Sequence, residues 1–315
     1  MGGEPRTQGL PRRPFGSTGL MVDPICLGTS GIGSAPETYG YSTPRERALE
    51  TIRAIFAGPI HFLDTSNNYG QGRSEEYIGI VLREIGGLPP GFVLATKADR
   101  DVQTGDFSGD RMRRSVQESQ RRLGMDRFPI LYLHDPENAP FEYITAPGGA
   151  LDALLELRDQ GIIEHLGVAG GPIDLLMRYV ETGAFEAVLT HNRYNLLNRE
   201  AEPLIQMASQ RGLAVVNAAA YGSGILAKGP DIYPRFRYRP ADEALLEKAR
   251  RMQSICASYG VPLPAAALQF SMRDPRITST IVGITHPERV AQTYALATYP
   301  IPEGLWPELE RIAGA

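Results

Sequence analysis

Residues 44–70 read PRERALETIRAIFAGPIHFLDTSNNYG, one amphipathic helical pattern followed by one short strand pattern. The helical part begins after Pro44 and ends at Gly58, residue types that favour a helix start and a helix stop. The strand part, residues 61–65, is short and apolar and leads into a polar loop. Units of this kind build α/β folds with parallel strands, so their recurrence along the chain decides the fold class.

The same alternation recurs along the whole chain. We predict strands at residues 25–28, 61–65, 92–97, 130–134, 165–169, 187–191, 214–218 and 279–283. Helical patterns cover residues 44–58, 74–86, 108–124, 149–161, 172–183, 201–212, 242–260 and 286–297. An open doubly wound sheet and a closed (β/α)8 barrel both contain such units. The count of eight, with no linker or charge-shifted half, favours a (β/α)8 TIM barrel.

The N-terminal residues come before the first of these units. Residues 1–11 are rich in glycine, proline and polar side chains and are predicted to form a flexible tail. The run RRPFGSTGLMVDPICLG, residues 12–28, has two short segments around residues 16–19, which predicts a β-hairpin. Residues 12–315 are predicted to form a single domain, because α/β barrels of this length are routinely one domain.

Composition excludes several classes of protein. The chain has 32 Lys+Arg and 36 Asp+Glu, a net charge of −4, and lacks the basic footprint of a nucleic-acid binder. No apolar run approaches the roughly 18 residues of a membrane span, and the N-terminus has no secretory signal. Cys26 and Cys256, the two cysteines, are too few for a disulfide scaffold or a cysteine-built zinc site. We therefore expect a soluble, cytoplasmic protein with a small-molecule substrate, no metal, and no nucleic-acid or membrane partner; the oligomeric state is not indicated.

Several familiar motifs do not fit this chain. The first strand runs into Gly28-Thr29-Ser30-Gly31-Ile32-Gly33, but the third glycine of a G-x-G-x-x-G pattern would fall on Pro36. A flexible strand-to-helix loop is the better interpretation. The chain has no phosphate-binding G-x-x-x-x-G-K-[ST] loop and no H-E-x-x-H zinc motif. Ser223 lies in Gly-Ser-Gly, which is not the G-x-S-x-G turn of a serine hydrolase.

Four polar residues lie at or just after the ends of neighbouring predicted strands. Asp64 ends the second strand, Lys97 the third and His134 the fourth, and Tyr69 follows in the loop after Asp64. Each residue alone has a common structural explanation, such as a cap, a packed ring or a surface lysine. Because all strand ends of a (β/α)8 barrel open onto one mouth, however, the four side chains are predicted to converge there.

The residue types in this constellation suit proton transfer. An unperturbed tyrosine has a pKa of about 10 and is a poor acid or base at neutral pH. A nearby ammonium favours the phenolate and lowers that pKa, and a buried carboxylate holds the ammonium in place. Lys97 is one of three lysines in the chain, which fits a specific need for a compact charge. Proton transfer at an oxygen pairs with hydride transfer at carbon, and a hydride requires a cofactor.

These residues resemble the aldo-keto reductase superfamily over nearly the whole chain. Asp64-Thr65-x-x-x-Tyr69-Gly70, followed by Gly72-x-Ser74-Glu75, matches the strand 2 signature of that family, and Lys97 and His134 match the rest of its tetrad. The resemblance implies a (β/α)8 barrel that binds NAD or NADP without a Rossmann fold. It implies that Tyr69 is the general acid/base, that Lys97 and Asp64 tune it, and that His134 positions the substrate oxygen.

The resemblance also implies a cofactor site, although several of its positions differ here. The implied cofactor-binding residues are Gly28, Thr29, Asp64, His191, Tyr221, Gly222, Ser223, Gly224, Leu226, Gly283, Thr285, Arg289 and Gln292. His191 stands where the family has a glutamine for the nicotinamide carboxamide. The Ser-Asn pair after strand 5 is Ala169-Gly170, and the stacking tyrosine after strand 7 is Ala218.

The residues after the last strand bear on which nucleotide is used. Family members that prefer NADPH often place Lys-Ser and then Arg around the 2′-phosphate, whereas this chain keeps only Arg289, next to Glu288. The loss of one cation removes a charge-assisted contact worth about 1.5–3 kcal/mol. We therefore expect a preference for NAD over NADP.

Within the superfamily, the segments LHDP, YNLLNR and NAAAYGSGIL are most similar to the D-threo-aldose (L-fucose) 1-dehydrogenase, L-galactose dehydrogenase and pyridoxal 4-dehydrogenase branch. That branch implies oxidation of a cyclic hemiacetal to a lactone. An NADPH-dependent reductase of aldehydes or ketones, and a non-catalytic NAD(P)-binding subunit that senses redox state, remain as alternatives. The long loops at residues 33–43 and 231–239 predict substrate contacts from Tyr39, Tyr233 and Phe236, in addition to Tyr69 and His134.

Overall fold

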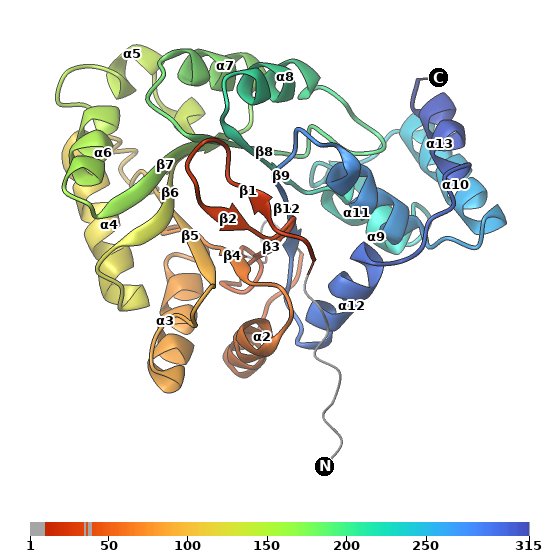
Figure 1. Ribbon diagram of the computed structural model, residues 1–315, viewed down its shortest axis with the longest axis horizontal. Helices are drawn as coiled ribbons and strands as arrows, with labels where there is room; N and C mark the ends of the chain where they lie inside the picture. The colour runs from red at the N-terminus through yellow and green to blue at the C-terminus, as the bar shows by residue number, and fades with distance from the viewer. Residues whose placement is uncertain (1–9, 35, 37–39, 315) are drawn as a thin grey trace.

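The computed structural model describes residues 10–34, 36 and 40–314, and its centre is a closed barrel of eight parallel strands (Figure 1). Around the barrel the strand order is β12-β3-β4-β5-β6-β7-β8-β9. The strands are β3 (Ile25–Gly28), β4 (Phe62–Asp64), β5 (Val93–Ala98), β6 (Phe128–His134), β7 (Ile163–Gly170), β8 (Ala187–His191), β9 (Ala214–Ala218) and β12 (Ser279–Gly283). The prediction of a (β/α)8 barrel is confirmed.

Helices surround this barrel (Figure 1). They are α2 (Arg45–Ala57), α3 (Arg73–Ile85), α4 (Gly109–Leu123), α5 (Phe141–Ile144), α6 (Ala150–Asp159), α7 (Ile173–Glu181), α8 (Glu202–Gln210), α9 (Ile225–Lys228), α10 (Glu243–Ser258), α11 (Leu263–Arg273), α12 (Glu288–Ala297) and α13 (Leu305–Gly314). Short 3-10 turns form η1 (Pro136–Asn138) and η2 (Gly222–Gly224). In the described part of the chain, none of these helices has the length and apolar character needed to cross a membrane.

Local chemistry explains where the best-defined helices begin and end. Ser108 accepts a hydrogen bond from the Arg111 N–H at the start of α4, and Asp242 caps α10 through the Leu245 N–H. Gly124 ends α4 in the left-handed conformation, with φ +70°, which glycine adopts without strain. The helical patterns of the sequence therefore gave the correct elements at these places.

Of the helices that the structure describes, four were not predicted: the four-residue α5 and α9, and the longer α11 and α13. α11 has the sequence LPAAALQFSMR and is buried along most of its length, so it lacks the polar face that produces an amphipathic pattern. α13 follows a proline-containing loop near the C-terminus and packs against α10. α11 and α13 lie on the outside of the barrel, and neither changes the order of its strands.

The N-terminal hairpin closes one end of the barrel. β1 (Arg13–Pro14) pairs antiparallel with β2 (Met21–Val22), as predicted, and the hairpin lies across the barrel in Figure 1. Phe15, at the turn, is fully buried and packs edge-on against Phe62 with ring centroids 6.4 Å apart. Phe15 belongs to the cluster of apolar side chains inside the barrel, so the N-terminal ends of the strands are sealed.

We predict that Gly79→Ala destabilises the protein, because α3 and α4 touch at this position. A Cβ on Gly79 would lie 1.8 Å from the backbone oxygen of Arg122. Replacing glycine by alanine inside a helix normally stabilises the helix by about 1 kcal/mol. Here the added methyl group would be forced against backbone, and such overpacking costs about 1–3 kcal/mol of stability. Urea unfolding should therefore show a lower free energy of unfolding. Arg83→Ala, at an exposed position of the same helix, is the control; an equally stable Gly79→Ala protein would contradict the packing.

Candidate active site

A buried ion pair lies at the open end of the barrel. Lys97 Nζ donates to Asp64 Oδ1 at 2.7 Å and to the Thr65 carbonyl oxygen at 2.6 Å. Asp64 and Lys97 are only 3% and 1% exposed. Strand register creates this contact: Asp64 on β4 pairs with Ala95 on β5, and Lys97 lies two residues further along on the same inward face.

Tyr69 lies above this ion pair. The Lys97 ammonium is 4.6 Å from the centroid of the Tyr69 ring, and the Tyr69 ring meets the His134 ring edge-on at 5.9 Å. The loop is held by a close backbone contact at Gly70, which has φ +60° and whose Cβ, if present, would lie 2.0 Å from the Gly33 oxygen. Only glycine fits this position, so the loop presents Tyr69 at a fixed place.

His134 is oriented by a carboxylate that the sequence analysis did not identify. The His134 Nδ1 lies 2.6 Å from Asp99 Oδ1, and Asp99 Oδ2 accepts from the Ser66 hydroxyl at 2.5 Å and from the Asn68 N–H at 3.1 Å. Asp99 follows Lys97 by two residues at the end of β5, so the rule that located Lys97 also locates Asp99. This contact leaves Nε2 of His134 as the ring nitrogen for a ligand.

The pKa values in this network follow from burial and charge. Burial alone would lower the pKa of His134, but the carboxylates of Asp135 and Asp99 outweigh it and raise that pKa. Burial would raise the pKa of Asp99, and the charge and hydrogen bond of His134 reverse this, so the pKa of Asp99 is lowered. For Asp64, burial dominates and raises the pKa despite the Lys97 charge.

These side chains surround one cavity of about 210 Å³ at the C-terminal ends of the strands. The tetrad predicted from the sequence, Asp64, Tyr69, Lys97 and His134, meets there as expected. The cavity is lined by Gly28, Ser30, Asp64, Tyr69, Lys97, His134, Asp135, Ala169, Gly170, Leu189, His191, Ala218, Ala219, Tyr238, Ile281 and Gly283. Ser30, Asp135 and Tyr238 were not among the residues predicted for the site.

The predicted cofactor residues fall into two groups. Gly28, His191 and Gly283 line the cavity with Asp64. The remaining positions lie outside its lining: Thr29, Tyr221, Gly222, Ser223, Gly224, Leu226, Thr285, Arg289 and Gln292. Thr29 is buried and donates to the Asp64 carbonyl oxygen at 2.9 Å, and Thr285 Oγ1 lies 3.1 Å from Nδ1 of His286. Gln292 is exposed and Arg289 half-buried, both on α12.

The predicted substrate residues Tyr233 and Phe236 lie over the η2 loop instead of lining the cavity. The Tyr233 ring lies 4.9 Å from the Lys228 ammonium and beside Gly224, and the Phe236 ring packs on Gly222. They belong to a segment that contains a second hairpin, β10 (Arg235–Phe236) with β11 (Arg239–Pro240). From this hairpin Tyr238, with φ +62°, reaches the cavity. Tyr39, the third predicted residue, lies outside the described residues.

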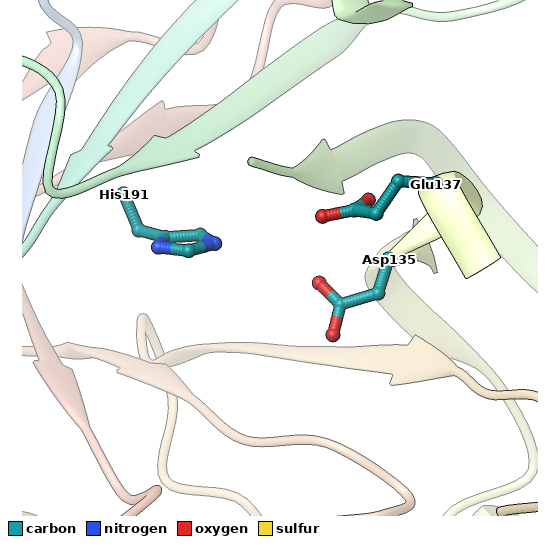
Figure 2. Close-up of side chains that lie close together, drawn as sticks. All are labelled: Asp135, Glu137 and His191. Carbon is teal, nitrogen blue, oxygen red and sulfur yellow. The ribbon is translucent and has the colours of Figure 1, made fainter. Parts of the chain in front are cut away.

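A second cluster lies beside His134, because Asp135 Oδ1 is 3.5 Å from Nε2 of His134. Among the residues that the structure describes, Asp135, Glu137 and His191 form the one group of histidine and acidic side chains with the spacing of a metal site, their ligand atoms all within 4.8 Å of one another (Figure 2). Burial lowers the pKa of His191 to about 4, so its ring is neutral at pH 7. Two of the three residues also line the cavity.

Comparison with known proteins gives one consistent family. A family model described as the aldo/keto reductase family matches residues 24–313. A D-threo-aldose 1-dehydrogenase from a Pseudomonas species is 29% identical, with 93% of this chain and 94% of that protein aligned. A pyridoxal 4-dehydrogenase from Microbacterium luteolum is 30% identical, with 95% and 96% aligned. L-galactose dehydrogenase from Arabidopsis thaliana is 29% identical, with 91% and 88% aligned. These matches confirm the resemblance.

The solved structures agree on the fold. An aldo-keto reductase from Bacillus halodurans in its holo form superposes with a TM-score of 0.77 over 96% of both chains, at 19% identity. A second aldo-keto reductase structure, from Pseudomonas aeruginosa, gives a TM-score of 0.67 at 24% identity over 92% of this chain and 96% of that one. At these identities, the comparison shows the barrel and its architecture.

The Asp99 contact predicts a measurable change in the titration of His134. In the native protein the pKa of His134 lies above its usual 6.5, whereas Asp99→Asn removes one of the two carboxylates that raise it. NMR titration of the imidazole Cε1–H signals should therefore show a lower midpoint for His134 in the variant. Asp159→Asn, on the outer helix α6, is the matched control. An unchanged His134 midpoint would mean that Asp99 does not set its charge.

Proposed function

Because the chain belongs to the aldo/keto reductase family, a family of NAD(P)-dependent oxidoreductase enzymes, we propose that it is a dehydrogenase that oxidises a cyclic hemiacetal to a lactone with NAD. The substrate class is an aldose, reacting at C1, or pyridoxal. The observation that carries the proposal is the buried Asp64–Lys97 ion pair beneath Tyr69, with His134 beside the phenol in the same cavity. This arrangement supplies a proton acceptor at the point where a hydroxyl would bind.

The residues present fit a nicotinamide nucleotide. Asp64 lines the cavity, and its Oδ2 is buried and has no hydrogen-bond partner among the described residues. This oxygen can therefore accept a hydrogen bond from a ribose hydroxyl. Gly283 has open space where a Cβ would stand, which permits close approach to the backbone. When bound, the nicotinamide accepts the hydride that no side chain can accept. Gly28, His191 and Gly283 would hold the nicotinamide in the cavity, and the Gly222–Gly224 turn would bind the pyrophosphate.

Tyr69 acts as the general base in the oxidation. Its phenolate oxygen takes the proton of the anomeric hydroxyl while the hydride leaves the carbon that bears this hydroxyl, and the C–O bond becomes the carbonyl of the lactone. In the reverse direction the same phenol donates the proton. The Lys97 ammonium, 4.6 Å from the ring, favours the phenolate, and Asp64 keeps that ammonium buried in place.

His134 positions the substrate oxygen. Asp99 holds its Nδ1, which leaves Nε2 to contact the same oxygen that Tyr69 deprotonates. Asp135 and Asp99 raise the pKa of His134 and so favour the protonated ring, which donates from both nitrogens. A donor at the reacting oxygen stabilises negative charge that develops there as the proton leaves.

The preference for NAD rests on the residues after β12. In the NADPH-linked pattern a lysine and an arginine surround the 2′-phosphate, whereas Glu288 precedes Arg289 here. A carboxylate repels a phosphate dianion, so the 2′-hydroxyl of NAD suits this surface better than the phosphate of NADP. An NADH-specific methylglyoxal reductase from Escherichia coli is among the relatives, at 25% identity.

The substrate class rests on three relatives whose names describe dehydrogenation of an aldose at carbon 1, of pyridoxal at position 4 and of L-galactose. Aldoses close to cyclic hemiacetals in water, and pyridoxal closes in the same way through its neighbouring hydroxymethyl group. Tyr69 and His134 together require one hydroxyl on the reacting carbon. The same reaction therefore applies to the substrates in all three names.

Formation of NADH at 340 nm tests this function. We expect turnover with NAD on at least one of L-fucose, L-galactose, D-arabinose and pyridoxal, and a kcat/KM for NADP lower by roughly tenfold or more. The product should be a lactone by mass spectrometry, two hydrogens lighter than the substrate. No turnover on this panel, together with NADPH consumption on simple aldehydes, would instead make the protein a reductase.

Tyr69→Phe tests the role of the phenol. We expect kcat to fall by about 100-fold or more, because a positioned acid/base contributes on that scale, while the dissociation constant for the nucleotide stays nearly the same. Tyr143→Phe, at an exposed position of α5, removes the same hydroxyl away from the cavity and should retain full activity. A Tyr69→Phe enzyme with more than a tenth of native activity would remove Tyr69 from this role.

A further inference from the structure

The side-chain alternation of β6 is broken at its end, where two successive residues face the same cavity. On β6, Tyr132 belongs to the apolar cluster inside the barrel, and Leu133 belongs to the cluster that includes the surrounding helices. Because successive side chains of a strand point to opposite sides, His134 faces inward and Asp135 is expected to face the helices. Asp135 instead lines the cavity together with His134.

A left-handed backbone conformation redirects Asp135. Its φ is +47° and its ψ is 52°, a region that residues other than glycine rarely adopt and that aspartate and asparagine tolerate best. The Asp135 N–H donates to the Ala169 carbonyl oxygen at 2.7 Å. The Asp135 carbonyl oxygen accepts from the backbone N–H of Asn138 at 3.1 Å and from its side-chain amide at 2.8 Å. Hydrogen bonds on both sides of the residue therefore fix the position of its side chain in the cavity.

The usual structural role of such an aspartate is not used here. Asp135 is the N-cap of η1, but in the described turn its side chain accepts no hydrogen bond from the η1 backbone. Among the described residues, the carboxylate has one polar contact within ion-pair distance, 3.5 Å from Oδ1 to Nε2 of His134. The Asp135 side chain is 43% exposed, whereas that of His134 is 13% exposed. The carboxylate therefore keeps acceptor positions that are open to a ligand of the cavity.

Charges of both signs surround Asp135. The ligand atoms of Glu137 and His191 lie within 4.8 Å of those of Asp135, and Figure 2 shows the three side chains facing one another. Burial, together with the charges of Arg193 and Arg237, lowers the pKa of His191 to about 4. These arginines therefore act on the same cluster and partly offset its two carboxylates. What Asp135 offers to a neutral ligand is a hydrogen-bond acceptor at a fixed position.

We propose that Asp135 recognises the hydroxyl group on the carbon next to the reacting carbon, so that the protein selects an aldose with a free 2-hydroxyl over pyridoxal. In the proposed function, Nε2 of His134 contacts the reacting oxygen, and Asp135 Oδ1 lies 3.5 Å from that nitrogen. Oxygens on adjacent carbons of a sugar ring lie about one hydrogen-bond length apart, so the second hydroxyl can reach the carboxylate while the first stays on His134. The inference rests on the proposed function, since it names the substrate class of that same site.

The two candidate substrates differ at this position. In a cyclic aldose, C2 carries a hydroxyl that donates to a carboxylate, and such a charge-assisted bond is stronger than one between neutral groups. In the hemiacetal of pyridoxal, the carbon next to the reacting carbon belongs to the pyridine ring and carries no hydroxyl. The oxygen on the following ring carbon is a phenolate at neutral pH, so it donates no hydrogen bond and is repelled by Asp135. The position of Asp135 therefore favours the sugar.

A kinetic comparison of sugars with and without the 2-hydroxyl tests this assignment. Each aldose that the protein oxidises is paired with its 2-deoxy analogue, for example D-arabinose with 2-deoxy-D-ribose, and the ratio of their kcat/KM values is measured from NADH formation. We expect Asp135→Gly, which accommodates the left-handed backbone, to lower this ratio by roughly tenfold or more. Asp135→Asn keeps a neutral acceptor and should lower the ratio less. Asp159→Asn, whose side chain is 75% exposed in the native protein, is the control and should leave the ratio unchanged.

The ratio separates recognition of the 2-hydroxyl from other effects of the substitution. Asp135 also raises the pKa of His134 against the effect of burial, so its loss changes the rate with every substrate. Both sugars of a pair share that change, and it cancels in the ratio. Where a variant is too slow to assay, calorimetric titration of its NADH complex with D-arabinonolactone and with 2-deoxy-D-ribonolactone gives the same comparison from dissociation constants. Circular dichroism melting curves verify that each variant is folded.

The possible outcomes distinguish this inference from the function on which it rests. A native protein that oxidises neither the sugars nor pyridoxal would refute the proposed function and, with it, the inference. A native protein that oxidises aldoses with a ratio that Asp135→Gly does not change would refute only the role of Asp135. A higher kcat/KM for pyridoxal than for every aldose tested would overturn the selection of a sugar and leave the proposed function in place.

Discussion

The buried contact between Lys97 and Asp64 is the constraint around which the site is built. Two charges with almost no access to water are tolerated only as a pair with further hydrogen bonds, which the Thr65 carbonyl oxygen provides. The pair exists because β4 and β5 are adjacent and in one register, so the closure of the barrel and the chemistry of its mouth depend on each other. Tyr69 takes its electrostatic environment from the same ammonium.

Much of the fold could be predicted because the pattern is local and repeated. β3, β8, β9 and β12 begin and end at the residues that the sequence indicated, since each is a short apolar run between polar loops. α11 could not be recognised, because a helix buried along most of its length shows no amphipathic period. The tetrad was accessible for a topological reason: in a parallel barrel, the ends of all strands meet at one rim.

The parts of the site that were missed depend on contacts between distant segments. Tyr238 reaches the cavity only because the second hairpin folds back over the η2 loop, with Tyr238 in the left-handed conformation, and no pattern in the sequence encodes this. Glu137 meets His191 across β7, where Gly170 leaves the space. A glycine in the sequence does not show which neighbouring side chain fills the space beside it, so this contact could not be predicted.

The hairpin that carries Phe15 determines where ligands can enter and leave the barrel. Since the N-terminal end of the barrel is sealed by this ring and the apolar cluster around it, ligands of the tetrad cavity enter and leave at the opposite rim. Two ligands that share a cavity with a single opening must bind one after the other. The ligand that lies deeper binds first and leaves last. Closure of one end of the barrel therefore sets the order of binding and release at the other end.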